Sequence, residues 1–299
     1  MASAQAIPDP NPTQTVASSL RDYYTLTKPE VNLLILMTTA AGYYLGSTGP
    51  FRVAGLINVL VGTLLVASGT ATLNQFMERS YDAQMRRTAN RPLVSGRVSA
   101  QEALWFGLSL SVAGALYLAA KVNGLSALLA ISTLLAYLLV YTPLKRITPL
   151  CTLLGAIPGA MPTLIGWAGA STRIDRHAWF LFAVLFLWQF PHFLAIALIY
   201  REDYSRAGFR MLPQWDIDGG FTKREIVGFT LVLVLTTVLP LAQRSGAAYL
   251  VCMLAAGIFF LYHTAKLTKS SSKVLARGVV HASVIYLPVV LAIMVAWKA

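Results

Sequence analysis

Nine runs of mostly apolar residues follow one another along this chain, and they constrain its fold more than any other feature. They lie near residues 31–47, 53–73, 102–120, 124–142, 150–170, 178–199, 226–242, 247–265 and 279–297. An apolar segment of ~20 residues spans the core of a bilayer as an α-helix. The strands of a membrane barrel would alternate apolar and polar residues instead. The sequence therefore predicts an all-α polytopic membrane protein with nine transmembrane helices in a bundle.

The charged residues are few, and their placement indicates a topology. They make up 12% of the chain, roughly half of the share in a soluble domain. If the N-terminus is cytoplasmic, 18 of the 24 Lys and Arg fall on the cytoplasmic side. Cytoplasmic loops of membrane proteins carry such an excess, so we expect the N-terminus inside and the C-terminus outside. The net charge of +12 is then a topology signal, and nucleic acid is not expected as a partner.

The N-terminal stretch lacks the features of a targeting signal. Residues 1–20 are rich in Ala, Ser and Pro and contain no Lys or Arg, whereas secretory and mitochondrial signals carry basic residues. We predict a disordered tail over 1–20, a single membrane domain over 21–299, and a bacterial inner membrane as the location. Cys151 and Cys252 lie far apart in apolar runs, so we expect them to pack there and to bind no metal.

One polar segment follows an apolar run without a linker. It reads "NQFMERSYDAQMRRTANRP" over residues 74–92. If the preceding helix continues, Asn74, Glu78 and Asp82 recur every fourth residue and share one face. Aligned carboxylates suit Mg²⁺, which usually binds one or two of them together with substrate phosphates. The alternative interpretation is a solvated helix end in which Asp82 pairs with Arg86.

Basic residues beside this stripe strengthen the interpretation as an anion site. Arg87 and Arg91 are four residues apart, and a guanidinium group binds phosphate oxygens through bidentate hydrogen bonds. A second segment, "YREDYSRAGFRMLPQWDIDGG" over residues 200–220, offers further charged side chains: Arg201, Asp203, Arg206, Arg210, Asp216 and Asp218. If the two segments face one another across the bundle, they form a two-sided clamp for a metal and a diphosphate.

Two apolar runs contain residues that bear on packing and on a cavity. The run near 150–170 contains Gly155 and Gly159 as a GxxxG pair, which predicts close helix packing, and two prolines that should bend the helix. The run near 178–199 contains Gln189 and His192, three residues apart and expected on one face. An ionisable residue inside a span is a functional candidate, although a hydrogen-bonded structural role for His192 is equally compatible with the sequence.

Several motifs together resemble those of the UbiA-type intramembrane prenyltransferase superfamily, and within it the branch that farnesylates heme, over residues ~22–297. "NQFMERSYD" is similar to the superfamily motif N-x-x-x-D-x-x-x-D, with Glu78 in place of the first Asp. The second motif, D-x-x-x-D, is reduced to Asp203 because residue 207 is Ala. The further matching stretches are "LTKP" at 26–29, "YTPLKRITP" at 141–149, "WQFPHF" at 188–193 and "DYSRAGFRMLP" at 203–213.

The resemblance implies a fold and a reaction. The fold is nine transmembrane helices around a central cavity with a cytoplasmic cap. The reaction transfers the farnesyl group of farnesyl diphosphate to a vinyl group of protoheme IX (heme b), with addition of water, and gives heme O and diphosphate. Heme b is then a substrate and Mg²⁺ the cofactor, and a downstream heme-modifying membrane enzyme is a candidate partner. The sequence assigns no residue to the added water.

The resemblance also implies roles for individual residues. The metal would be held by Asn74, Glu78, Asp82 and Asp203. The substrates would be contacted by Lys28, Arg87, Arg91, Tyr141, Lys145 and His192. For Tyr141 a packing role at the membrane interface is an open alternative.

Two other functions remain as alternatives. A quinone-pathway aromatic prenyltransferase, of the 4-hydroxybenzoate type, is disfavoured by the reduced second motif and by "WQFPHF". A non-enzymatic heme transporter or chaperone would place charged residues at mid-span, whereas the carboxylates here cluster at the cytoplasmic boundary.

Overall fold

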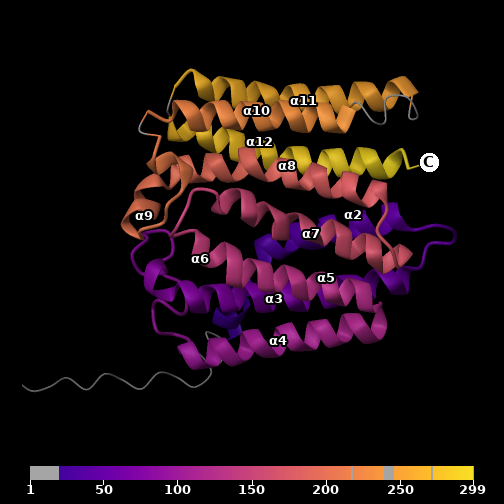
Figure 1. The fold of residues 1–299 in the computed structure, drawn as a ribbon, viewed down its shortest axis with the longest axis horizontal. Helices are drawn as coiled ribbons and strands as arrows, with labels where there is room; N and C mark the ends of the chain where they lie inside the picture. Colours follow the sequence, from indigo (N-terminus) through magenta and orange to yellow (C-terminus); the bar gives the residue numbers. More distant parts are fainter. Residues whose placement is uncertain (1–19, 217, 239–245, 271, 299) are drawn as a thin grey trace, which may run out of the picture.

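The structure is a computed structural model that describes residues 20–216, 218–238, 246–270 and 272–298 (Figure 1). Residues 1–19, nearly all of the predicted tail, lie outside the described part, so the tail and the single domain over 21–299 stay predictions. Within the described residues every regular element is helical, which confirms the predicted all-α class.

Each predicted apolar run falls on a long helix, although the run 226–242 is described only as far as Val238. The helices are α2 (Pro29–Gly46), α3 (Val53–Asp82), α4 (Ala100–Lys121), α7 (Cys151–Ser171), α8 (Arg176–Ile199), α10 (Gly220–Val238), α11 (Gly246–Thr268) and α12 (Lys273–Ala296). The run 124–142 is divided into α5 (Gly124–Leu135), the π-helix η1 (Ala136–Tyr141) and α6 (Thr142–Leu144). Two short helices, α9 (Arg201–Arg206) and η2 (Leu212–Gln214), lie between α8 and α10.

Seven helical stretches among the described residues are long and apolar enough to cross a membrane, with α5, η1 and α6 counted as one continuous stretch, Gly124–Leu144. The two that fall short are α2, which is 18 residues long and begins with Pro29 and Glu30, and α10, whose first turns contain Lys223, Arg224 and Glu225. Because their first turns are polar, the apolar part of both helices is shorter than the helix itself. The chain is a multi-pass membrane protein, and the count of nine spans stays a proposal.

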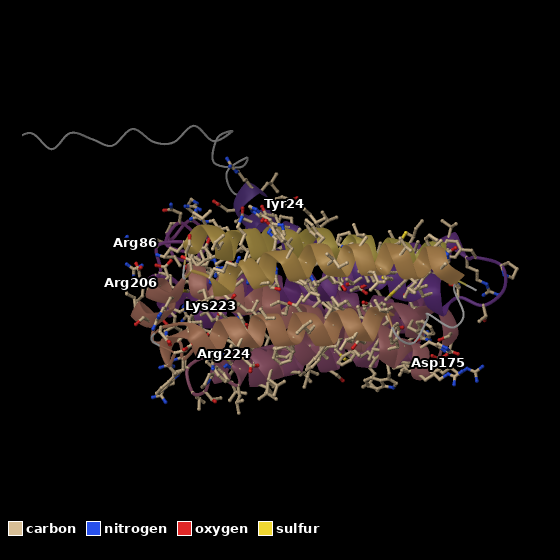
Figure 2. All side chains as sticks on the ribbon, turned by 90° about the horizontal axis from the view of Figure 1, so that it is seen from above. Tyr24, Arg86, Asp175, Arg206, Lys223 and Arg224 are labelled. Atoms are coloured by element: carbon tan, nitrogen blue, oxygen red, sulfur yellow. The ribbon has the colours of Figure 1, made fainter. Side chains whose placement is uncertain are left out.

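The long helices lie side by side along the longest axis of the molecule (Figure 1). Figure 2 shows Arg86, Arg206, Lys223 and Arg224 at one end and Asp175 at the other. The loop after α3 and the segment between α8 and α10 therefore meet at the same end. This is the arrangement that the distribution of Lys and Arg along the sequence predicts.

The largest buried cluster joins α8, α10, α11 and α12 and extends to α7 and α2. Tyr249, Phe260 and Tyr286 are fully buried in it, and Tyr249 satisfies its hydroxyl by donating to the carbonyl of Thr237 at 3.1 Å. A polar tip that finds a backbone partner allows a tyrosine to be buried in an apolar cluster. This half of the bundle is filled by side chains, and it forms a wall against which α7 packs through α8.

Backbone contact between α2 and α7 fixes the position of α2. A Cβ atom on Gly166 would lie 2.0 Å from the carbonyl oxygen of Thr39, and one on Gly42 would lie 2.2 Å from that of Thr163. Small residues permit such close approach of helices in a membrane. The segment just before α2, which carries Lys28, is thereby held against the cavity described below.

We predict that Gly166→Ala destabilises the fold, because the added methyl group meets the backbone of α2 and cannot be relieved by rotating a side chain. Overpacking of this kind costs about 1–3 kcal/mol, and thermal unfolding in detergent should show a lower midpoint. Gly228→Ala in α10 is the matched control, since its Cβ would meet no atom within 4 Å. An unchanged midpoint in Gly166→Ala would contradict the close contact.

Candidate active site

The helix α3 continues well past its apolar run, as predicted. It has 30 residues and is therefore ~45 Å long, against ~30 Å for the apolar core of a bilayer. Its last turns carry Asn74, Glu78 and Asp82, which are 1%, 5% and 1% exposed. All three line one cavity of about 410 Å³. The stripe is thus a cavity wall, and the interpretation as a solvated helix end is wrong.

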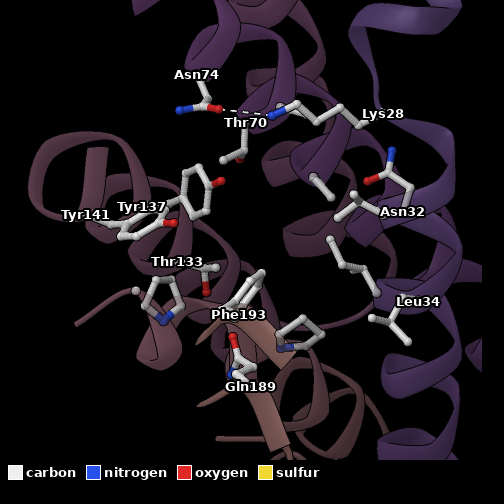
Figure 3. Close-up of a pocket in the computed structure, with 18 of the residues that line it drawn as sticks. Lys28, Asn32, Leu34, Thr70, Asn74, Thr133, Tyr137, Tyr141, Gln189 and Phe193 are labelled. Atoms are coloured by element: carbon white, nitrogen blue, oxygen red, sulfur yellow. Dashed lines mark hydrogen bonds between the residues drawn. The ribbon is translucent and has the colours of Figure 1, made fainter. Parts of the chain in front are cut away.

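Each residue of this stripe binds one cationic side chain. Lys28 Nζ donates to Asn74 Oδ1 at 3.0 Å, as the dashed line in Figure 3 shows. Lys145 Nζ lies 2.8 Å from Glu78 Oε1, and Arg91 Nη1 lies 2.5 Å from Asp82 Oδ2. These pairs join α3 to the start of α2, the end of α6 and the loop after α3. Asp82 therefore pairs with Arg91 and not with Arg86, which is absent from the described cavity lining.

Lys28 reaches the cavity through an unusual backbone conformation. Its φ is 51° and its ψ is 65°, so it occupies the left-handed region directly before Pro29. That region is uncommon for residues other than glycine, and strained residues of this kind concentrate at functional sites. Burial lowers the pKa of Lys28 to about 7, and repulsion from Arg91 and Lys145 adds to the effect.

Aromatic rings surround the other cations at this end of the cavity. Lys145 Nζ lies 4.5 Å from the centre of the Tyr141 ring. Arg87 lines the cavity and donates from Nη2 to the hydroxyl of Tyr204 at 3.3 Å. Gly155 makes room for Tyr141, because a Cβ there would lie 2.5 Å from the ring. The structure therefore brings Arg87, Tyr141 and Lys145 to the cavity, together with Tyr204, which the sequence did not single out.

Beyond the charged end, the cavity is mostly apolar. The side chains that line it there include Thr133, Tyr137, Gln189 and Phe193 (Figure 3). Pro158, Pro162 and Trp188 line it as well. Tyr137 and Tyr141 both belong to the π-helix η1, and such local widening of a helix is frequent at functional sites. The two prolines of α7, Pro158 and Pro162, line the cavity, which agrees with the prediction that they help to shape it.

Asp203 does not reach the cavity, in contrast to the predicted two-sided clamp. Its Oδ1 binds the guanidinium of Arg206 and accepts from the backbone N–H of Arg86 at 3.4 Å. Burial alone would raise the pKa of Asp203, but these partners outweigh burial and lower it. The carboxylate fixes the loop after α3. Asp216 likewise has a local role, because it accepts from the backbone N–H of Thr222 at 2.6 Å near the start of α10.

His192 has different neighbours from Gln189, although the two residues are only three positions apart on α8. Its Nδ1 lies 2.7 Å from Ser283 Oγ of α12, and its ring stacks on Trp188 at 4.8 Å between centres. It is absent from the described cavity lining, whereas Gln189 belongs to it. A spacing of three residues turns the two side chains only about 60° apart, yet of the two only Gln189 belongs to the described cavity lining. Contact of His192 with a substrate stays a prediction.

The donor set at the charged end fits Mg²⁺. Among the described residues, no three His, Cys, Asp or Glu side chains group into a metal site. The cavity offers two carboxylates and the Asn74 amide, and Mg²⁺ commonly takes one or two carboxylates and completes its shell with water and phosphate oxygens. Cationic side chains already lie on all three groups, so the stripe is a place where positive charge is stabilised.

Comparison with known proteins agrees with this geometry. The model of the UbiA prenyltransferase family matches residues 35–294. A protoheme IX farnesyltransferase of Solibacter usitatus is 47% identical over 285 residues, which cover 92% of this chain and 98% of that protein. A protoheme IX farnesyltransferase of Koribacter versatilis is 44% identical over 300 residues and covers 97% of this chain and 96% of its own length.

Solved structures share the fold at low sequence identity. A digeranylgeranylglyceryl phosphate synthase has a TM-score of 0.76 at 19% identity, over 94% of this chain and 99% of its own. A UbiA homologue from Archaeoglobus fulgidus, bound to GPP and Mg²⁺, has a TM-score of 0.63 at 16% identity, over 91% and 99%. With a charged cavity mouth, matching family motifs and close relatives over nearly the whole length, this chain belongs to the UbiA prenyltransferase family and, within it, to the protoheme IX farnesyltransferases.

Proposed function

We propose that this protein transfers the farnesyl group of farnesyl diphosphate to a vinyl group of protoheme IX, with addition of water, and releases heme O and diphosphate. The observation that carries the proposal is one cavity with a charged mouth and a long apolar interior. A diphosphate needs the charged mouth, and an isoprenoid chain needs the apolar interior. The name shared by the close relatives supports this reaction over the two alternatives.

The charged mouth would bind the diphosphate together with its metal. Asn74, Glu78 and Asp82 would hold Mg²⁺, which when bound neutralises the charge that develops on the leaving diphosphate. Lys28, Lys145 and Arg91 would then exchange their present partners for phosphate oxygens, with Arg87 beside them. Donors placed in advance in a site that excludes water stabilise developing charge most effectively. The bound GPP and Mg²⁺ of the Archaeoglobus fulgidus homologue make this arrangement reasonable.

The apolar interior would protect the reactive farnesyl group. The positive charge that develops on its first carbon must meet the heme vinyl group before it meets bulk water. Tyr137 and Tyr141 lie at the boundary between charged and apolar walls, and aromatic faces attract a cation. Their placement next to the diphosphate end suits the point at which the carbon–oxygen bond breaks.

The decisive assay supplies membranes containing the protein with heme b, farnesyl diphosphate and Mg²⁺, followed by mass analysis of the extracted hemes. We expect a farnesylated, hydroxylated heme that disappears when Mg²⁺ is chelated. Farnesylation of a phenolic acid with no heme product would support the quinone-pathway alternative. Heme binding without any prenylated product would support a transporter or chaperone.

We also propose nine spans, a bacterial inner membrane location and a cytoplasmic cap over the cavity mouth, with the N-terminus inside and the C-terminus outside. The cluster of Arg86, Arg206, Lys223 and Arg224 at one end supports the orientation (Figure 2), since cytoplasmic loops are rich in Lys and Arg. A reporter that fluoresces only in the cytoplasm should stay dark when fused after Ala299 and be bright when fused before Met1. The reverse pattern would contradict this topology.

A further inference from the structure

Gln189 is a buried polar side chain that the binding of metal and diphosphate does not use. It lies in the middle of α8, is 3% exposed and lines the cavity. Its Nε2 donates to the carbonyl of Ala156 in α7 at 2.9 Å and to that of Leu185 at 3.2 Å. Both amide hydrogens are thus used, and the opposite amide orientation would place oxygen against two carbonyl oxygens. The network therefore fixes which end of the amide is oxygen.

The oxygen of this amide faces the cavity. Within the part of the chain that the structure describes, no donor binds Gln189 Oε1, and Figure 3 shows the oxygen pointing into the cavity beside Phe193. Gly159 leaves space for it, because a Cβ at that position would lie 1.9 Å from Oε1. A fixed acceptor without a donor, in a mostly apolar wall, calls for a ligand that donates a hydrogen bond.

The position of Gln189 relative to the charged mouth identifies that ligand. Gly155 faces Tyr141, and Gly159 faces Gln189, so the two side chains lie one turn of α7 apart, or ~6 Å. Tyr141 in turn lies against Lys145 at the diphosphate end. Gln189 is therefore about one turn of α7 inside the end at which farnesyl would separate from diphosphate, and the proposed reaction requires the heme vinyl group to reach that point.

We propose that Gln189 is a positioning residue that holds the water molecule added to the heme substituent, an inference that rests on the proposed farnesyl transfer. A buried water needs at least two polar partners, and other polar side chains, Thr133 and Tyr137 among them, line the same cavity (Figure 3). An amide oxygen accepts a hydrogen bond from water without removing its proton. Gln189 thus orients the water oxygen and leaves its lone pair free.

The reaction then balances with water as the only further reactant. The bond between the farnesyl carbon and the diphosphate oxygen breaks, and its electron pair leaves with diphosphate. The vinyl π pair forms the new carbon–carbon bond, so that positive charge develops on the carbon next to the porphyrin ring. The water oxygen bonds to this carbon, and the released diphosphate takes the proton. Without a held water, the cation instead loses a proton and gives an alkene that lacks the elements of water.

The test measures the ratio of hydroxylated to dehydrated farnesyl heme, which loss of folded protein does not change. In Gln189→Leu we expect this ratio to fall about tenfold, the effect of losing one hydrogen bond. Gly159→Ala, which displaces the amide, should shift it in the same direction. The matched control is Gln75→Leu, since Gln75 is equally buried and donates to the carbonyl of Leu26 at 2.8 Å without lining the cavity.

The outcomes separate this inference from the proposed function. If the wild type gives no farnesylated heme, the proposed function itself is wrong. A wild-type ratio in Gln189→Leu, or an equal shift in Gln75→Leu, would overturn the role of Gln189 alone. If Gln189→Leu gives no product, Gln189→Met, which keeps the length of the side chain, provides the ratio. Absence of product in both variants would assign Gln189 to formation of the carbon–carbon bond and would also overturn its assignment to water.

Discussion

Replacing Glu78 by alanine is expected to lower the rate of farnesyl transfer by about 10²–10³-fold, the usual effect of removing one preorganised electrostatic group. The loss should nearly equal that of Asp82→Ala. Both carboxylates are buried on the same wall of the cavity, and both would bind the same metal ion. The measurement is heme O formation at a series of Mg²⁺ concentrations, where both variants should also need more Mg²⁺ for half-maximal rate.

A surface carboxylate provides the control for this prediction. Glu202 is exposed and pairs with Lys273 at 3.0 Å, and exposed pairs of this kind contribute little, so Glu202→Gln should keep wild-type activity. Glu78→Gln tests the charge alone, because glutamine keeps the size of the side chain. We expect this variant still to need more Mg²⁺ than the wild type. Full activity in Glu78→Ala would remove this residue from the site.

Lys145→Met is expected to cause the largest loss of stability at the site. The pair between Lys145 Nζ and Glu78 Oε1 is 2.8 Å long, and the two side chains are only 10% and 7% exposed. Removing one partner of a buried ion pair leaves an uncompensated charge and typically costs about 3–5 kcal/mol. Unfolding in a series of mixed detergents should report this loss for the variant, and heme O formation should be lost with it.

The double variant Lys145→Met/Glu78→Gln distinguishes the pair from the individual residues. Its stability should return toward that of the wild type, because neither charge remains unpaired, while its activity should stay absent. A Lys145→Met protein as stable as the wild type would mean that Glu78 finds another cation, and Lys28 would be the first to examine, since it binds the neighbouring Asn74.

The charged stripe could be predicted from the sequence because its residues belong to one helix. A spacing of four residues places Asn74, Glu78 and Asp82 on one face whatever the rest of the chain does. The family motifs then assigned Lys28 and Lys145 to the same site, although nothing in their local sequence shows which oxygen each one meets. Those pairings depend on how α2 and α6 pack against α3.

The predictions that the structure did not support concern residues with partners elsewhere in the chain. Asp203 matches the metal-binding motif, yet it is absent from the described cavity lining and binds Arg206 and the backbone N–H of Arg86. Gly155 and Gly159 match a helix-packing motif, and they do admit neighbouring helices, through the side chains of Tyr141 in η1 and Gln189 in α8. A glycine leaves the same space for a helix or for a side chain, and only the packed neighbours decide between them.

The sequence by itself determined the helical membrane class, the distribution of charge that predicts the topology, the face carrying the carboxylates and the family. These properties depend on local apolar length and on helical periodicity, which a chain carries before it folds. The tertiary structure alone decided which cation lies on which carboxylate, that Asp203 binds Arg206 and the backbone of Arg86, and that the oxygen of Gln189 faces the cavity (Figure 3). Such contacts join residues up to 117 positions apart, and their energies depend on distances that only packing sets.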